Sequence, residues 1–363
     1  MTELHDLFID HGQSPWLDNL RRGWMTDGEM QRWIDQGIRG LTSNPSIFQK
    51  AIADSADYDE QFGRLIGDGT SVDDAYWDLV TTDIEAALAL LRPVYDASHG
   101  LDGYVSVEVD PGLARDTEGT IVAARRLHAG IDEPNLYVKI PATAEGIPAI
   151  EQMIAEKRSI NVTLIFSLDR YAEVTEAYLA GLERADGDLS TISSVASFFV
   201  SRVDTEVDRR LEEAGRPDLA GQLAVANARL AYRHWQDAFG TVRWQELAAR
   251  GATAQRCLWA STSTKNPAYR DVVYVEELVG PDTVNTMPME TLVAFREHGE
   301  VRRGTLCEGL AEAEQLLLDL AAAGVDYDDV VATLEAEGVD KFSDSFSDLL
   351  AGIEAKTSVL RAA

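Results

Sequence analysis

Hydrophobic residues recur along this chain with two alternating periods. Eight short segments show the period of two, or the unbroken apolar run, that predicts a β-strand: residues 16–20, 38–44, 104–109, 135–141, 160–166, 191–200, 257–261 and 283–287. Most of the segments between them have the period of three to four that predicts a helix. Because parallel strands need crossover connections of this kind, the pattern predicts a parallel α/β fold.

Residues at the helix ends support these boundaries. Thr26-Asp-Gly-Glu29 predicts a capping box for a helix through Ile34, Pro45 suits the first position of the next helix, and Ser167 suits an N-cap. Longer helical segments are predicted at residues 71–91, 113–129, 145–157, 167–183, 202–249 with an interruption at Pro217, and 305–360.

The number of strands favours a closed barrel over an open, doubly wound sheet. No Gly-x-Gly-x-x-Gly follows any predicted strand, so an open dinucleotide-binding sheet loses its main support. We therefore predict a (β/α)8 TIM barrel with additional helices near 205–250 and 305–360. Since no linker of low complexity interrupts the chain, residues 1–363 are predicted to form a single domain.

One predicted strand, residues 135–141, carries a lysine among apolar residues. Side chains alternate along a strand, so Tyr137 and Lys139 share the face opposite to Leu136, Val138 and Ile140. A lysine in this position is typical of an edge strand, where it blocks unwanted pairing. The alternative is a desolvated interior, which disfavours an ammonium and frees the amine to attack a carbonyl.

Five other predicted strands also have a face that bears polar residues. These residues are Asp18, Asn44, Glu108, Asn161 with Thr163, and Ser197, which shares its face with Phe199. In a barrel one face of every strand looks into the interior, and functional side chains gather at the C-terminal ends. A polar strand end is often only solvated. A lysine with two carboxylates at one mouth, however, suits imine chemistry, which needs a nucleophilic amine and groups that move protons.

The composition of the chain restricts the kinds of molecule that it could bind. The chain has 363 residues, with 62 acidic and 32 basic residues and a formal net charge of −30. This charge argues against nucleic acid and anionic membranes, and an anionic substrate would need a local basic pocket. Two cysteines, Cys257 and Cys307, lack metal-ligand spacing, and the histidines form no i, i+4 pair. We expect no metal, no cofactor and, without a secretory signal or an apolar run of about 20 residues, a cytoplasmic location.

Four segments resemble the transaldolase family, and together with the residues around them they span residues 18–266. Gly40-Leu-Thr-Ser-Asn-Pro-Ser46 and Leu136-Tyr-Val-Lys-Ile-Pro-Ala-Thr-Ala-Glu-Gly146 resemble its two signatures. Asn161-Val-Thr-Leu-Ile-Phe-Ser167 and Ser197-Phe-Phe-Val-Ser-Arg202 are similar to two further family segments. The resemblance implies a metal-free, class I mechanism on a barrel whose fourth strand carries the Schiff-base lysine.

The same resemblance implies catalytic roles. Lys139 would attack the ketose carbonyl of a sugar phosphate and form a carbinolamine and then an imine. Asp18 would act as the general base that starts cleavage of the carbon–carbon bond. Glu108 with Thr163 would position a water that shuttles protons while the imine forms and hydrolyses.

Substrate contacts are implied in the same way. The dihydroxyacetone part would be held by Asn44, Asn161 and Ser197, and the phosphate would be bound by Arg202, whose guanidinium fork suits that geometry. Ser261 matches the family pattern, but the residues after it depart from it. In that segment Lys265 is either a second phosphate-binding cation or an ordinary loop lysine.

Three functions are compatible with these residues. The first is a transferase of the non-oxidative pentose phosphate pathway, which moves a dihydroxyacetone unit from sedoheptulose 7-phosphate to glyceraldehyde 3-phosphate and gives erythrose 4-phosphate and fructose 6-phosphate. The second is a lyase of the fructose 6-phosphate aldolase type, and the third is a non-catalytic sugar-phosphate binding protein. The joint presence of Lys139, Asp18 and Glu108 argues against the third. The length of the chain and the apolar Phe199 favour the first, and a homodimer stays open.

Overall fold

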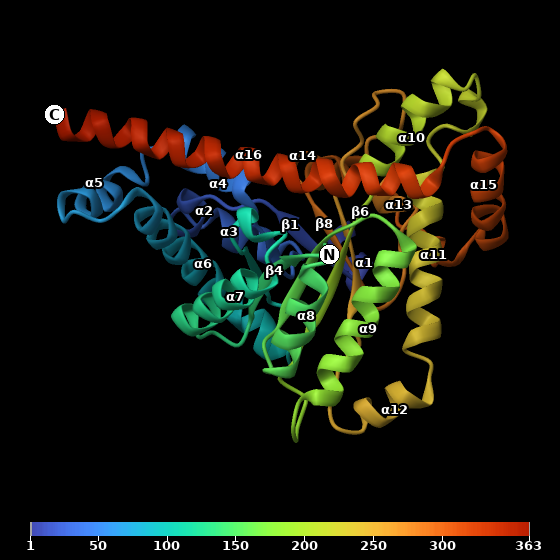
Figure 1. Ribbon diagram of the computed structural model, residues 1–363, viewed down its shortest axis with the longest axis horizontal. Coiled ribbons are helices and arrows are strands. Elements are labelled where there is room, and N and C mark those ends of the chain that lie inside the picture. The colour runs from blue at the N-terminus through green and yellow to red at the C-terminus, as the bar shows by residue number, and fades with distance from the viewer. Residues whose placement is uncertain (1, 363) are drawn as a thin grey trace.

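Eight parallel strands close into a barrel, with helices packed around them (Figure 1). The computed structural model describes residues 2–362 and, within them, all side chains except those of residues 54 and 355–362. Each strand pairs with the next, and the last pairs with the first. The strands are β1 (Gln13–Asp18), β2 (Leu41–Thr42), β3 (Val105–Glu108), β4 (Leu136–Pro141), β5 (Ile160–Ile165), β6 (Ser194–Phe199), β7 (Arg256–Ala260) and β8 (Thr283–Met287). The (β/α)8 barrel is therefore confirmed.

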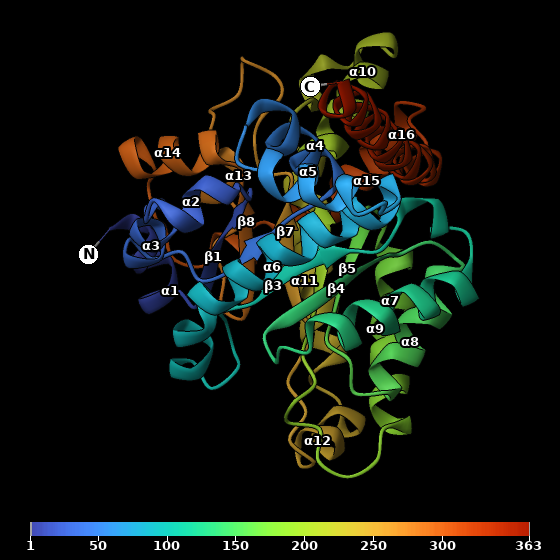
Figure 2. The ribbon, with the colours of Figure 1, turned by 90° about the vertical axis from the view of Figure 1, so that its left-hand side faces the viewer.

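Helices surround the barrel and extend beyond it at the C-terminal end of the chain (Figures 1 and 2). They are α1 (Glu3–Ile9), α2 (Arg22–Thr26), α3 (Glu29–Asp35), α4 (Pro45–Asp54), α5 (Asp59–Gly67), α6 (Val72–Ala97), α7 (Thr117–Ile131), α8 (Gly146–Ala155), α9 (Leu168–Arg184), α10 (Ser201–Glu213), α11 (Leu223–Ala238), α12 (Val242–Ala248), α13 (Val273–Glu276), α14 (Met289–His298), α15 (Leu310–Ala322) and α16 (Tyr327–Ala362). The predicted helical segments at 202–249 and 305–360 are therefore each divided into several helices.

Two of the three predicted helix starts are confirmed. Asn44 caps α4 with Pro45 at its first position, and the Ser167 hydroxyl accepts a hydrogen bond of 2.9 Å from the Arg170 amide at the start of α9. The capping box at Thr26 is wrong, because Thr26 ends α2. Gly28, with a φ of 80°, separates α2 from α3, since this left-handed conformation cannot continue a helix.

The closed barrel decides the position of Lys139. β4 pairs with β3 on one side and β5 on the other, so it is not an edge strand. The side chain of Lys139 is 6% exposed. The edge-strand explanation for this lysine is therefore wrong, and the desolvated interior is confirmed.

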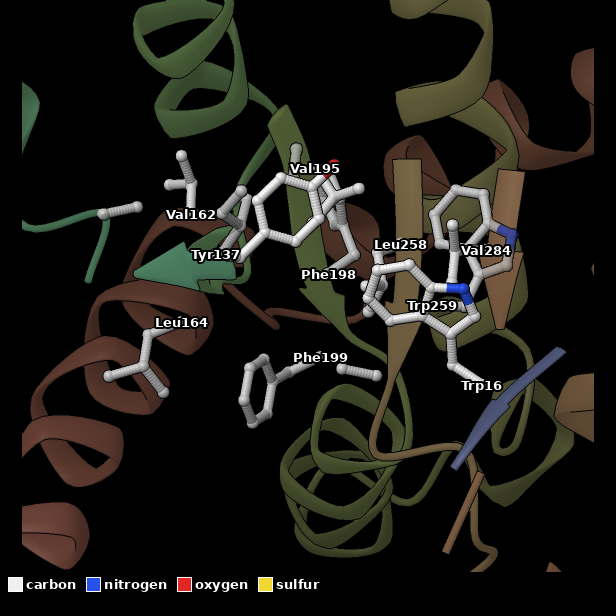
Figure 3. Packing of buried hydrophobic residues seen from close by; sticks show 14 of the residues in the cluster. Trp16, Tyr137, Val162, Leu164, Val195, Phe198, Phe199, Leu258, Trp259 and Val284 are labelled. Atoms are coloured by element: carbon white, nitrogen blue, oxygen red, sulfur yellow. The ribbon is translucent and has the colours of Figure 1, made fainter. Parts of the chain in front are cut away.

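A layer of aromatic side chains fills the middle of the barrel. The rings of Tyr104 and Tyr137 stack with centroids 4.0 Å apart, and Trp16 lies 6.1 Å from Tyr137 inside the ring of strands (Figure 3). Gly40 permits this packing, since a Cβ there would lie 2.3 Å from the Trp16 ring. Along β1 and β4 the next inward residues after Trp16 and Tyr137 are Asp18 and Lys139. The aromatic layer therefore forms the floor of the C-terminal mouth.

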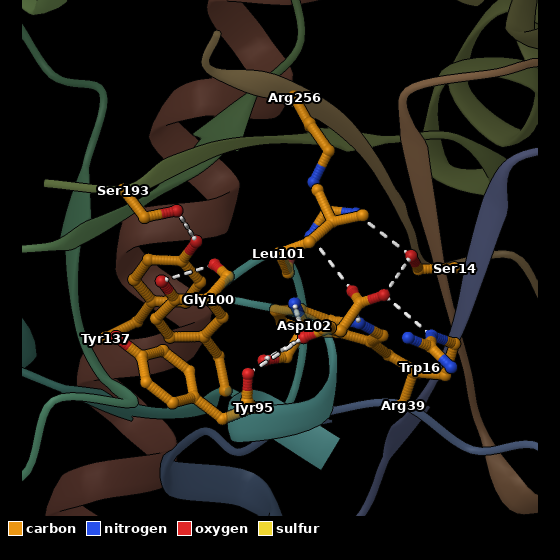
Figure 4. A network of polar contacts seen from close by, with 12 residues as sticks. Ser14, Trp16, Arg39, Tyr95, Gly100, Leu101, Asp102, Tyr137, Ser193 and Arg256 are labelled. Atoms are coloured by element: carbon orange, nitrogen blue, oxygen red, sulfur yellow. Dashed lines mark hydrogen bonds and ion pairs between the residues drawn. The ribbon is translucent and has the colours of Figure 1, made fainter. Parts of the chain in front are cut away.

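Below this floor, at the N-terminal end of the barrel, lies a buried ionic network (Figure 4). The carboxylate of Asp102 accepts hydrogen bonds from Arg39 at 2.7 Å, from Arg256 at 3.0 Å and from Ser14 at 2.8 Å. Its fourth donor is the indole N–H of Trp16 at 3.3 Å. The network ties the loop before β3 to the first residues of β1 and β7.

Helix α16 crosses the other end of the barrel (Figures 1 and 2). Phe346 packs against Tyr76 of α6 with ring centroids 5.3 Å apart, and the hydroxyls of Ser345 and Ser46 are 2.7 Å apart. Leu164 of β5 lies against α16, as Figure 3 shows, and Phe199 points toward the same helix. The end of the chain thus covers part of the barrel mouth.

Candidate active site

The C-terminal ends of the strands surround a cavity of about 160 Å³. Nine of the eleven site residues predicted from the sequence line it: Asp18, Asn44, Lys139, Thr163, Ser197, Phe199, Arg202, Ser261 and Lys265. The other two, Glu108 and Asn161, lie directly behind this lining and contact it. Seven segments that are far apart in the sequence therefore meet at one place.

Lys139 occupies the buried end of the cavity. Its Nζ donates a hydrogen bond of 3.1 Å to the Ser43 carbonyl and lies 3.5 Å from Oε2 of Glu108. Strand register explains the pairing, because Glu108 of β3 is directly opposite Lys139 of β4. Both side chains are 6% exposed, so the amine and the carboxyl group share a nearly dry environment.

Two carboxyl groups beside Lys139 are shifted toward their neutral forms. Burial raises the pKa of Glu108, and the charge of Lys139 opposes this shift only in part. Burial likewise raises the pKa of Asp18, against the charge of Lys139 and a hydrogen bond of 2.8 Å from the Thr42 hydroxyl. One lysine thus neighbours two carboxyl groups that both exchange protons more readily than an exposed aspartate or glutamate near neutral pH.

Two buried oxygen atoms near the lysine keep free hydrogen-bonding capacity. Oε2 of Glu108 and Oγ1 of Thr163 make no hydrogen bond with any residue that the structure describes. Thr163 projects from β5, where it pairs in register with Pro141 at the end of the lysine strand. Buried polar atoms are normally hydrogen-bonded, so these two are suited to a bound water or to substrate.

A chain of hydrogen bonds fixes the polar side of the cavity. Ser197 donates to Oδ1 of Asn161 at 2.7 Å, and the Asn161 amide donates to Ser106 at 3.0 Å. Asn161 therefore lies behind Ser197 and orients it. Asn44, which lines the cavity, accepts a hydrogen bond of 3.0 Å from the Ile47 amide through its side-chain oxygen, so its NH2 group is the part of the side chain available to a ligand.

Basic side chains lie at the outer end of the same cavity. Arg202 lies in the first turn of α10, and its guanidinium carbon is 5.0 Å from the ring of Phe199 and 5.9 Å from that of Phe342. Lys265 lies in the loop after β7, and its Nζ donates to the Ser263 hydroxyl at 2.5 Å. Both cations line one cavity, and an anion held there would lie opposite the lysine end.

Backbone strain marks two strand ends at this site. Leu164 has a φ of 58° where the register of β5 and β6 shifts between Val162 and Ile165. Ser261 has a φ of 55° just after β7, and its hydroxyl lies 3.0 Å from that of Ser201 at the start of α10. A left-handed conformation is unfavourable for residues other than glycine and is often retained at functional sites.

Sequence reasoning missed several residues of the cavity. Thr42 lies on the same face of the predicted strand 38–44 as Asn44, so the alternation of side chains along that strand could have identified Thr42 as a site residue. Thr286 lies 2.7 Å from Thr42 through their hydroxyls, and Phe342 reaches the cavity from α16. No local pattern identifies Phe342, because a helical period shows an apolar face but not what that face covers.

Two structural findings concern metal-binding groups and membrane-spanning helices. Among the side chains that the structure describes, no group of three or more His, Cys, Asp or Glu is close enough to hold a metal ion. None of the helices described is both long and apolar enough to cross a membrane.

Fold and site together define a (β/α)8 barrel protein with a buried lysine between two carboxyl groups. Residues 15–353 match the family model described as transaldolase/fructose-6-phosphate aldolase. The chain is 53% identical to a transaldolase of Saccharopolyspora erythraea over 346 residues, which cover 94% of each chain, and 52% identical to one of Acidothermus cellulolyticus over 348 residues, also 94% of each. It is 51% identical to a transaldolase of Mycobacterium leprae over 93% of this chain and 92% of that one. The chain therefore belongs to the transaldolase/fructose-6-phosphate aldolase family.

Proposed function

We propose that the protein is a transaldolase. It transfers a dihydroxyacetone unit from sedoheptulose 7-phosphate to glyceraldehyde 3-phosphate, which gives erythrose 4-phosphate and fructose 6-phosphate, in the non-oxidative pentose phosphate pathway. The observation that carries this proposal is the arrangement of one cavity, with Lys139 and two carboxyl groups at its buried end and Arg202 at its outer end. Relatives named transaldolase at about half identity support it.

In the first half of the reaction, the amine of Lys139 adds to the ketose carbonyl. Glu108, with a water held between it and Thr163, gives a proton to the departing hydroxyl, so that water leaves and the imine forms. Asp18 then takes the proton of the hydroxyl next to the breaking carbon–carbon bond. The bond electrons move into the imine nitrogen, the first aldehyde departs, and an enamine stays on Lys139.

The second half reverses these steps with another aldehyde. The enamine carbon attacks the acceptor carbonyl, Asp18 returns its proton to the new hydroxyl, and water hydrolyses the imine. Ser197, oriented by Asn161, and the NH2 group of Asn44 would hold the hydroxyls of the three-carbon unit, while Arg202, Ser261 and Lys265 would bind the phosphate.

Transfer requires that the enamine is not protonated before the acceptor arrives. Phe199 lines the cavity on the same strand as Ser197, and its ring brings no hydroxyl to the reacting carbon. An apolar group there slows protonation and so favours transfer over release of free dihydroxyacetone. The aldolase is the second candidate, because the matching family description includes it.

One experiment separates these two activities. Fructose 6-phosphate alone should release about one equivalent of glyceraldehyde 3-phosphate per active site, as expected for a covalent intermediate that awaits an acceptor. Adding erythrose 4-phosphate should then start rapid turnover, and Phe199→Tyr should increase the release of dihydroxyacetone. If dihydroxyacetone appears without acceptor as fast as transfer proceeds, the protein is an aldolase.

We also propose a domain organisation and a cellular compartment for the enzyme. We take residues 1–363 as one domain, because α16 packs on the barrel through α4, α6 and α10. The cytoplasm is the proposed compartment, and it would keep both cysteines, which form no disulfide, in the reduced state.

A further inference from the structure

One face of α16 forms part of the wall of the active-site mouth. Phe342 lines the cavity, and its ring lies 6.4 Å from that of Phe199. A Cβ on Gly338 would lie 3.7 Å from Nη1 of Arg202, so the helix backbone comes very close to this cation. Residues 338, 342 and 345 repeat at helical spacing, and Lys341 belongs to the same face.

Lysines are scarce in this chain and gather at this mouth. The sequence contains six. Lys139 and Lys265 line the cavity, Lys341 directly precedes Phe342 of the lining, and Lys50 is near enough for its charge to act on Lys341. The charge of Arg202 is the largest influence that lowers the pKa of Lys341, followed by burial and by the charges of Lys265 and Lys50. These like charges therefore repel one another at close range.

The charges of Asp18, Glu337 and Glu108 act on Arg202, but none of these acids forms an ion pair with it. Arg202, Lys50, Lys265 and Lys341 make no ion pair with any described residue, although the chain has 62 acidic residues. Glu337, one turn before Lys341, is the acid on α16 whose charge reaches Arg202. Unpaired cations that repel one another are unfavourable unless an anion binds between them.

We propose that Lys341 is a third phosphate-binding cation, which α16 brings to the side of Arg202 and Lys265. The inference rests on the proposed function, because it assigns the phosphate of the sugar substrate to this place. The C-terminal helix then does more than cover the barrel. It makes binding depend on a phosphate group and so selects phosphorylated sugars over free ones.

A pair of variants on the same helix tests this role. Lys341→Gln should raise KM for fructose 6-phosphate about tenfold, the effect of losing one charge-assisted contact, with kcat nearly unchanged. Glu337→Gln removes the opposite charge one turn away and should lower that KM about two- to threefold. Both positions are exposed, so neither change creates a cavity. Damage to the helix would shift both values in the same direction.

Two controls complete the design. Lys157→Gln makes the same change of charge far from the mouth, where its Nζ donates to the Asp188 carbonyl, and should leave KM unchanged. With dihydroxyacetone as the donor and unphosphorylated glyceraldehyde as the acceptor, no phosphate is present, and Lys341→Gln should behave as the wild type. Equal changes in KM for phosphorylated and free substrates would overturn the inference.

Binding measurements separate this inference from the proposed function. Calorimetry with inorganic phosphate should show a dissociation constant that rises about tenfold in Lys341→Gln and falls back in Lys341→Arg. A protein that loses phosphate affinity in this way but transfers no dihydroxyacetone would retain the third cation and refute the transaldolase proposal. Unchanged phosphate affinity in an active Lys341→Gln enzyme would refute the third cation alone.

Discussion

The barrel encloses two buried ionic clusters, one on each side of its aromatic layer, and they differ in how completely their charges are paired. At the N-terminal end Asp102 has two arginines, a serine and an indole as hydrogen-bond donors. Burial alone would raise the pKa of this carboxyl group, but Arg256 and Arg39 hold it below its ordinary value. At the C-terminal end Lys139 is the closest cation to two carboxyl groups whose pKa values are both raised.

The difference shows how one fold keeps charges inside for two purposes. A buried carboxylate with every oxygen satisfied is locked in one state and ties together the strands that hold it. A carboxyl group with too few partners is poised to change its protonation state, which a catalytic group must do. The stable cluster lies at the end of the barrel where structural interactions are expected, and the reactive one lies at the end where active sites occur.

The largest expected effect is on activity, at the upper cluster. Lys139→Ala should reduce kcat by more than about four orders of magnitude, because no other group can form the imine. The fold should survive, since removing a buried amine also removes its desolvation cost. Steady-state kinetics and urea unfolding on one preparation measure both. An activity loss that follows unfolding would place Lys139 in the structural class of Asp102.

Asp102→Asn should show the reverse pattern. It leaves the buried Arg256 and the partly buried Arg39 without their counter-charge, so the free energy of unfolding should fall by about 3–5 kcal/mol. The kcat of the folded fraction should stay within about twofold of the wild type, because the aromatic layer separates this network from the cavity. Glu108→Gln is the matched control, with a large loss of kcat and a small change in stability. A loss of kcat in Asp102→Asn at full folding would show that the two clusters are coupled.

The outer end of the cavity should respond to mutation through binding alone. Arg202→Ala should weaken the binding of phosphorylated substrates by about 2 kcal/mol, and Lys265→Ala should do so to a lesser degree. Inhibition by inorganic phosphate provides the readout without chemistry. If Lys265→Ala leaves that inhibition unchanged, the loop after β7 contributes no cation to the phosphate site.

The smallest expected effect is on the pH dependence of stability, and it has opposite signs in the two clusters. Glu108 has a raised pKa in the folded protein. Its contribution to the free energy of unfolding is therefore complete below pH 4.5, the ordinary pKa of a glutamate, and is lost as the pH rises through the pKa of the folded protein. Asp102 has a lowered pKa in the folded protein. Its contribution to the free energy of unfolding is therefore present above pH 3.8, the ordinary pKa of an aspartate, and is lost as the pH falls through the pKa of the folded protein.

Urea unfolding measured at pH values below and above these pKa values compares the contributions of Glu108 and Asp102 to stability directly. Glu108→Gln should gain stability relative to the wild type as the pH rises, while the deficit of Asp102→Asn should shrink as the pH falls. If the stability of both variants changed with pH in the same way, the two carboxyl groups would not differ in how completely they are paired.

Much of the barrel could be predicted from sequence because its information is local. Alternation along each strand placed Lys139 and Glu108 on inward faces, and closure of the barrel brought those faces together. The errors have local causes as well. The segment 38–44 is a strand only at Leu41–Thr42, because Asn44 already caps the next helix, and Gly28 displaced the helix start expected at Thr26.

The remainder of the site depends on contacts between distant segments. Phe342 lines the mouth, and Lys341 lies near Arg202, only because α16 crosses the barrel and packs on α4. The order of hydrogen bonds from Ser197 through Asn161 to Ser106 follows from strand register, which alternation alone does not determine. Which charges end up unpaired is likewise a property of the assembled barrel, so the contrast between the two clusters could not be seen in the sequence.

Lys139, the cation beside two incompletely paired carboxyl groups, is the proposed nucleophile. Borohydride reduction in the presence of fructose 6-phosphate, followed by peptide mass mapping, tests it directly, because reduction makes the imine permanent. We expect one stable adduct per chain, on the peptide that contains Lys139, and none in Lys139→Ala. An adduct on Lys265, Lys341 or any other lysine, or an active enzyme that forms no adduct at all, would contradict it.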